Sequence, residues 1–155
     1  MTAAAQPRSL ADKVVRLSAS PEEMLAAANR AVANLRGEFE RWLAKDVASM
    51  SEMVRTIATR PKLAEGAREK LRRQAHTTKG QGTTFGYDLI TAIAGSLNHY
   101  LVEVPAERQR LNVIRAHVEA LDAVAKSRLT GDGGDAGHAL VATLTGAIAQ
   151  SGGSE

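Results

Sequence analysis

Residues 75–86 read Ala-His-Thr-Thr-Lys-Gly-Gln-Gly-Thr-Thr-Phe-Gly, where helical spacing and several glycines occur together. Small or apolar side chains recur here and upstream every three or four residues, which predicts one buried face of a helix. This buried line consists of Ala64, Ala67, Leu71, Ala75, Thr78, Gly82 and Phe85. His76 follows Ala75 by about 100° of helix rotation, so we expect it to flank the core without entering it. Gly86 should end the helix in the left-handed conformation that glycine favours.

Gly80 and Gly82 lie inside this helix and weaken it, since each glycine costs about 1 kcal/mol relative to alanine. Gly80 follows His76 by four residues and therefore lies one turn along the same surface. Its missing side chain would clear the space that a bulky partner needs beside the imidazole. Gly82 either serves the same purpose or permits close packing of two helices, and the sequence leaves both readings open.

The spacing of chemically distinctive residues in this segment resembles the signature of histidine phosphotransfer (HPt) domains. The matching residues are His76, Lys79, Gly80, Phe85, Gly86 and the apolar Leu89. HPt domains are helical bundles that relay phosphoryl groups between the receiver domains of response regulators. The resemblance is closest to the bacterial single-domain type.

The resemblance covers roughly residues 24–150, with further matches at 38–42 (Glu-Phe-Glu-Arg-Trp) and 131–134 (Gly-Asp-Gly-Gly). Thr78 departs from the family pattern, where leucine or isoleucine is usual, and this weakens the core beneath the histidine. The pair at 81–82, Gln-Gly, stands where small residues such as serine or alanine are common. Neither departure touches the phosphoacceptor position.

The resemblance implies a phosphorelay intermediate in which His76 takes a phosphoryl group from one receiver aspartate and gives it to another. A neutral imidazole is a good nucleophile near neutral pH. The ammonium of Lys79 can stabilise phosphoryl oxygens, although an ordinary exposed lysine is the alternative. The receiver would supply the aspartate and a magnesium ion, so we expect no cofactor or metal bound by this chain. We expect the receiver to dock on Arg72, Arg73, Gly80, Gly82, Phe85 and Gly86.

The chain as a whole is predicted to be all-α, because alanine, leucine and charged residues dominate and strand-like alternation is absent. We expect an antiparallel four-helix bundle with additional short N-terminal and C-terminal helices. The predicted domains are an N-terminal extension at 1–20, the bundle at 21–150 and a flexible tail at 151–155. The predicted helices are 10–17, 21–60 with an interruption at Gly37, 61–85, 88–102, 106–129 and 136–149.

The long helix up to residue 60 should begin with Ser20 as N-cap and Pro21 in its first position. Its buried stripe follows three-and-four spacing and consists of Phe39, Leu43, Val47, Met50, Val54 and Ile57. Trp42 lies beside this stripe, either as the edge of the core or as a partner-docking residue.

Composition narrows the class of protein. With 155 residues the chain is long enough for one self-sufficient domain. It has no cysteine, which excludes disulfides and thiolate metal sites. The first residues lack the apolar run of a signal peptide and no stretch approaches a membrane span, so a cytoplasmic protein with no membrane partner is expected. We expect the HPt-like protein to be a monomer.

The main rival interpretation is a non-catalytic basic bundle that binds nucleic acid or acts as a scaffold. It rests on residues 60–79, which carry seven basic side chains against two acidic ones. Aromatic residues amount to 3% of the chain, which leaves few stacking platforms for single strands, so we do not expect nucleic acid as a partner.

Two further enzyme classes are disfavoured. No GK[ST] phosphate-binding loop is present, so we expect neither ATP binding nor kinase activity. A phosphoacceptor domain of a histidine kinase usually has an acidic residue directly after the histidine, where this chain has Thr77. The remaining histidines, His99, His117 and His138, lack metal-ligand spacing and are predicted to be structural or surface residues.

Overall fold

Helices and short 3-10 turns make up the regular structure of residues 19–152, the part of the chain that the computed structural model describes. In chain order the elements are α2 (Pro21–Thr59), η1 (Pro61–Leu63), α3 (Ala64–Phe85), α4 (Asp88–Glu103), η2 (Ala106–Arg108), α5 (Leu111–Ser127) and α6 (Gly134–Gly152). These described residues form no β-strand, which confirms the predicted all-α class. The predicted short helix at 10–17 lies outside the described residues.

The contacts divide the chain at Gly37 into two compact units, residues 1–37 and 38–155. Helix α2 contributes to both, with Pro21–Gly37 in the first unit and Glu38–Thr59 in the second. This division falls inside helix α2. The predicted domains at 1–20, 21–150 and 151–155 stay a prediction.

The beginning of α2 follows its sequence signals. The Oγ of Ser20 accepts a hydrogen bond from the backbone N–H of Glu23 at 3.1 Å, and Pro21 occupies the first helical position. The predicted interruption at Gly37 is wrong, since α2 passes through it. One glycine costs only about 1 kcal/mol, which a long helix of alanine, leucine and charged residues on both sides can absorb.

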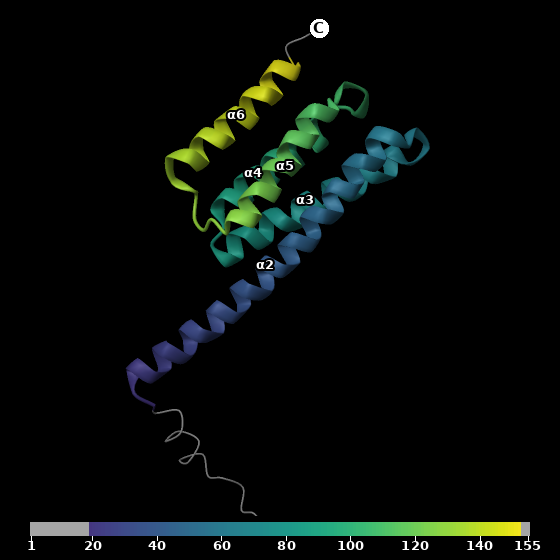
Figure 1. Ribbon diagram of the computed structural model, residues 1–155. Coiled ribbons are helices and arrows are strands. Elements are labelled where there is room, and N and C mark those ends of the chain that lie inside the picture. Colours follow the sequence, from purple (N-terminus) through teal and green to yellow (C-terminus); the bar gives the residue numbers. More distant parts are fainter. Residues whose placement is uncertain (1–18, 153–155) are drawn as a thin grey trace, which may run out of the picture. The chain divides into compact units, whose positions relative to one another are not determined.

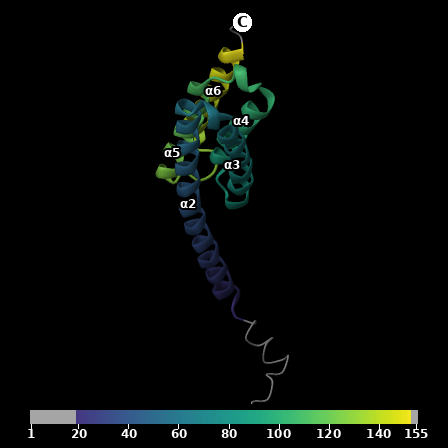
Figure 2. The same cartoon turned by 90° about the vertical axis from the view of Figure 1, so that its right-hand side faces the viewer.

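Within the second unit, the later half of α2 packs with α3, α4 and α5 around one core, and α6 lies against α4 and α5 (Figure 1, Figure 2). The predicted stripe of α2, from Phe39 to Ile57, is buried as expected. The predicted line of α3 is buried from Ala64 to Gly82, and Phe85 is partly buried with its ring stacked on Phe39 at 4.8 Å. The predicted helical bundle is therefore confirmed.

The turn between α3 and α4 is held by backbone hydrogen bonds from a distant loop. Gly86 ends α3 with φ +81°, the left-handed conformation that the sequence predicts. The carbonyl of Gly86 accepts a bond from the N–H of Gly131 at 2.8 Å, and the N–H of Leu89 bonds the carbonyl of Gly131 at 2.8 Å. The loop between α5 and α6 thus fixes the place where α3 stops and α4 begins.

The predicted helix at 106–129 starts later than expected. Residues 106–108 form a 3-10 turn, Gln109 and Arg110 are extended, and α5 begins at Leu111. The reason is a side-chain cap: the amide of Gln109 donates hydrogen bonds to the carbonyls of Leu101 (3.2 Å) and Val104 (2.8 Å), at the end of α4. Gln109 makes these two hydrogen bonds from an extended backbone, so the helix starts after it.

A polar pair sits inside the bundle between α4 and α5. His117 is fully buried, its Nδ1 lies 2.8 Å from the carbonyl of Val113 and its Nε2 lies 2.9 Å from Ser96 Oγ. Because the carbonyl can only accept, Nδ1 carries the proton and Nε2 accepts from the serine hydroxyl. Burial lowers the pKa of His117 below its ordinary value, which favours this neutral form.

The buried His117 predicts a loss of stability in mild acid. The unfolded chain takes up a proton as the pH falls through about 6.5, the ordinary pKa of histidine, whereas the folded chain resists protonation. Urea unfolding at pH 7.5 and pH 5.5 should therefore show a lower free energy of unfolding at the acidic pH. The His117→Gln variant should lose less stability over this interval, and His99→Gln, on an exposed position, should behave as the original chain. An unchanged pH dependence in His117→Gln would contradict the assignment.

Candidate functional site

His76 lies near the middle of α3 with its side chain exposed. Its neighbours in sequence explain this orientation, because Ala75 and Thr78 are fully buried and hold the opposite side of the helix in the core. Within the described residues the imidazole makes no hydrogen bond or ion pair. The expected position beside the core is thus observed, and both ring nitrogens are available to an external partner.

Lys79 is exposed one turn after His76, and its side chain runs across α4. A Cβ added at Gly95 would lie 3.4 Å from the Cδ of Lys79, so the glycine leaves room for the lysine stem. The carbonyl of Lys79 also accepts a hydrogen bond from Thr91 Oγ1 at 3.0 Å. No carboxylate pairs with the ammonium in the part of the chain that is described. Gly95 and Thr91 were not singled out from the sequence, because only the packing of α4 on α3 reveals their part.

The two arginines before His76 already have a partner. Arg72 Nε donates to Glu69 Oε2 at 3.0 Å, and Arg73 Nε lies 3.9 Å from Glu69 Oε1. The hydrogen bond from Arg72 lowers the pKa of Glu69, which therefore stays ionised. This shared carboxylate offsets part of the basic charge around the histidine, so fewer cations remain for an outside anion than the sequence indicates.

The two glycines of the motif have different surroundings. A Cβ added at Gly80 would meet nothing within 4 Å, whereas one at Gly82 would lie 2.5 Å from Thr91 Oγ1 and 3.1 Å from the carbonyl oxygen of Tyr87. Gly80 is exposed and Gly82 is buried. The open question about Gly82 is therefore answered in favour of close helix packing, while Gly80 leaves the surface beside His76 clear.

Phe85 and Gly86 also have roles within the fold, as a ring stacked on Phe39 and as the end of α3. Docking of a partner through Gly82, Phe85 or Gly86 stays a prediction, and burial makes Gly82 the least accessible of them. Trp42, in contrast, is 48% exposed, which is more than expected for the edge of a core.

The pairing of α3 with α4 extends the site to a second helix. Gly82 meets Thr91, Lys79 meets Gly95, and Arg72 lines the same groove as Val102, so the two helices run antiparallel in a fixed register. In this register the turn of α4 between Gly95 and Val102 faces the turn of α3 that carries His76. Val102 is an exposed apolar side chain on that stretch.

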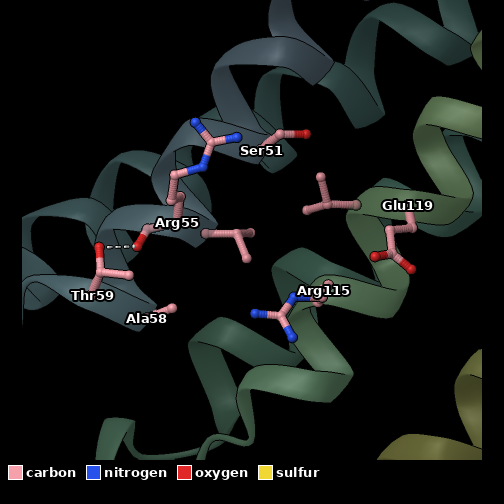
Figure 3. A pocket seen from close by; sticks show the side chains of 8 residues that line it. Ser51, Arg55, Ala58, Thr59, Arg115 and Glu119 are labelled. Carbon is pink, nitrogen blue, oxygen red and sulfur yellow. Dashed lines mark hydrogen bonds between the residues drawn. The ribbon is translucent and has the colours of Figure 1, made fainter.

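His76 is not among the residues that line three grooves on the surface of the described residues. The first, of about 320 Å³, lies between α2 and α5, where Figure 3 shows Arg55 and Arg115 on facing helices. The second lies between α2 and α3, and the third includes Arg72 but not the histidine. An exposed imidazole outside these three grooves suits a macromolecular partner better than a small ligand, which needs a concave site.

The other histidines lie apart from this surface chemistry. His138 Nε2 lies 2.9 Å from Asp132 Oδ2, His99 is exposed, and His117 belongs to the core. The pKa of Asp132 is lowered chiefly by the backbone N–H of Gly134, with a further contribution from His138. Among the described residues no group of three or more histidine, aspartate or glutamate side chains could hold a metal ion.

Comparison with known proteins identifies the family. The family model described as Hpt domain matches residues 34–124, which is more than half of the chain, so the protein belongs to the Hpt domain family. The comparisons with curated proteins and with solved structures gave no match. The family match includes His76, Lys79, Gly80 and the helices that hold them.

Membership assigns the chain to histidine phosphotransfer in two-component phosphorelays, whose Hpt domains interact with receiver domains. The matched range excludes most of the first half of α2 and all of α6. None of the described helices is long and apolar enough to cross a membrane.

The two glycines should respond in opposite ways to an added side chain. Gly80→Gln should raise the free energy of unfolding by up to about 1 kcal/mol, because it replaces a poor helix former at an open position. Gly82→Ala should lower it by about 1–3 kcal/mol, because the new Cβ collides with Thr91 and the backbone of Tyr87. Urea denaturation of both variants measures the two effects.

The stabilised Gly80→Gln variant should nevertheless transfer phosphate more slowly. Phosphoryl transfer needs the reacting atoms about 3–3.5 Å apart, and a side chain beside His76 would hold the receiver away. Gly66→Gln is a matched control, since Gly66 is another exposed, open position of α3 outside the motif. Normal transfer by Gly80→Gln would show that Gly80 does not provide clearance.

Proposed function

We propose that this protein is a phosphorelay intermediate that accepts a phosphoryl group on His76 from a receiver aspartate and passes it to a second receiver. The observation that carries the proposal is the exposed imidazole of His76 beside the open surface at Gly80, inside the segment that matches the Hpt family. The imidazole of His76 is exposed and makes no hydrogen bond within the described residues, so a ring nitrogen is free to attack a phosphoryl group.

The transfer is a displacement at phosphorus. The unprotonated nitrogen of the neutral imidazole attacks, an N–P bond forms, and the P–O bond to the aspartyl carboxylate breaks. The carboxylate leaves with the bonding electrons, and the other ring nitrogen then loses its proton to solvent. The reverse attack by a second aspartate restores the histidine. The covalent part that this chain plays is limited to the attack by His76. Most of the catalysis therefore comes from positioning the reacting atoms and from stabilising the charge of the phosphoryl group.

Lys79 would stabilise the phosphoryl oxygens on His76. It lies one turn away on the same side of α3, and its ammonium has no carboxylate partner among the described residues. A charge-assisted hydrogen bond from the ammonium is worth more than a neutral one. Gly95 acts as a positioning residue, because its open surface lets the lysine stem lie across α4.

The receiver would dock over α3 and α4 with His76 near the centre. Val102 provides an apolar contact, and Arg72 and Arg73 provide polar contacts near the same face. The receiver would bring its own aspartate and magnesium ion, and the complex would form in the cytoplasm. Apolar contacts at the centre would make this interaction less sensitive to salt than phosphate-driven nucleic-acid binding. The shared pairing of Arg72 and Arg73 with Glu69 supports this choice over the basic-bundle alternative.

His76 should be the single phosphorylated histidine. Incubation with a receiver that carries labelled aspartyl phosphate should give the chain an acid-labile, alkali-stable label. His76→Gln should abolish the label, whereas His99→Gln and His138→Gln, both at exposed positions, should retain it. Labelling of the His76→Gln protein at the original level would refute the assignment.

Loss of the Lys79 charge should slow transfer without stopping it. If its contact with the phosphoryl group contributes about 1.5–3 kcal/mol, Lys79→Ala should transfer about one to two orders of magnitude more slowly. Lys70→Ala is the matched control, because Lys70 is exposed on α3 but points to the opposite side of the helix. Single-turnover transfer rates from the labelled receiver separate the two, and equal rates would remove Lys79 from the site.

A further inference from the structure

The first half of α2, Pro21–Gly37, carries an apolar face with nothing described against it. Four large side chains on it are about half exposed or more: Met24 (55%), Leu25 (62%), Val32 (49%) and Leu35 (49%). Together with Ala28 and Ala31 they fall within an arc of about 120° around the helix. A continuous exposed apolar face of this kind marks an interaction surface.

The spacing of this face is that of a helix-packing seam. Leu25, Ala28, Val32 and Leu35 follow one another at intervals of three, four and three residues, the repeat of paired helices. The polar side of the same segment carries two glutamates and two arginines. That balance gives no electrostatic attraction to an anionic membrane surface, which basic amphipathic helices possess.

We infer that the occupant is the same segment of a second copy of this chain, packed antiparallel. With Leu25 opposite Leu35 of the other copy, Ala28 falls opposite Val32, so each large side chain faces a complementary position. The same register brings Glu22 to Arg36 of the other copy. Both side chains are exposed, and neither is in an ion pair within the described residues.

Charge order along the segment selects the antiparallel direction. Its acidic residues, Glu22 and Glu23, stand at the start, and its basic residues, Arg30 and Arg36, stand towards the end. An antiparallel pair therefore places opposite charges together twice, by two-fold symmetry, whereas a parallel pair places like charges side by side.

Two alternatives fit this surface less well. The helix that the sequence predicts at residues 10–17 would span roughly 12 Å, against roughly 17 Å from Met24 to Leu35. The Hpt fold itself does not account for the face either, since the family match begins at residue 34. The inferred dimer differs from the expectation of a monomer, and it does not depend on the proposed phosphotransfer.

The first experiment measures the mass of the full chain by light scattering between about 10 µM and 1 mM, the range in which a short interface associates. The mass should rise with concentration towards twice 16.4 kDa. Val32→Glu should weaken association at least tenfold, because it places a carboxylate in the seam. Ala33→Glu adds the same carboxylate one residue later on the polar side and should associate as the original chain does. A constant monomer mass, or equal effects of the two variants, would overturn the inference.

The second experiment determines whether the two helices pack parallel or antiparallel. Because the chain has no native cysteine, every disulfide that forms comes from the introduced cysteines. Leu25→Cys and Leu35→Cys are prepared as separate full-length chains and oxidised alone and as a mixture. Antiparallel packing brings Cys at position 25 of one chain close to Cys at position 35 of the other. The yield of disulfide-linked dimer should therefore be much higher in the mixture than in either variant alone. Disulfide dimers that form equally well within each single preparation indicate parallel packing and refute the antiparallel arrangement.

Discussion

The close approach of α3 and α4 at Gly82 is the contact on which the site depends. No side chain fits between this position and Thr91, so the two helices can come together only where α3 has a glycine. Their register then places Gly95 under the stem of Lys79 and the exposed part of α4 beside His76. A histidine on an isolated helix would have the same neighbours along the chain but no second helix to complete its surface.

The residues that stabilise α3 in the bundle differ from those on its exposed surface. Residues that hold α3 in place, such as Leu71, Ala75 and Thr78, are buried and uncharged. The side chains that we propose to meet the phosphoryl group, His76 and Lys79, are exposed. The polar group inside the bundle, His117, is fully satisfied by Ser96 and Val113 and takes no part in the surface chemistry. Two histidines of one bundle thus have opposite environments, since His76 is exposed on α3 and His117 is buried on α5.

Periodicity was enough to predict the buried faces, because helical burial repeats every three or four residues and glycine marks the end of α3 at Gly86. His76 as the exposed residue beside the core followed from the same geometry. The start of α5 and the position of the Lys79 side chain could not be predicted, because they depend on contacts between segments that are distant in the sequence. The cap that Gln109 places on α4 delays α5, and the space at Gly95 seats Lys79, yet neither leaves a local pattern. The interruption expected at Gly37 was wrong because a local penalty of one glycine is small beside the propensity of a long helix.

The hydrogen bonds of Gly131 with Gly86 and Leu89 bear on which part of the chain is needed for a stable fold. The segment shared with the family ends at residue 124, yet the turn that closes α3 is held by the backbone of Gly131, and Leu144 of α6 is buried in the same core. A fragment trimmed to the shared segment would lose both supports. The family match therefore ends before the fold does in this protein. Helix α6 lies outside the matched segment, but it contributes to the core of the bundle.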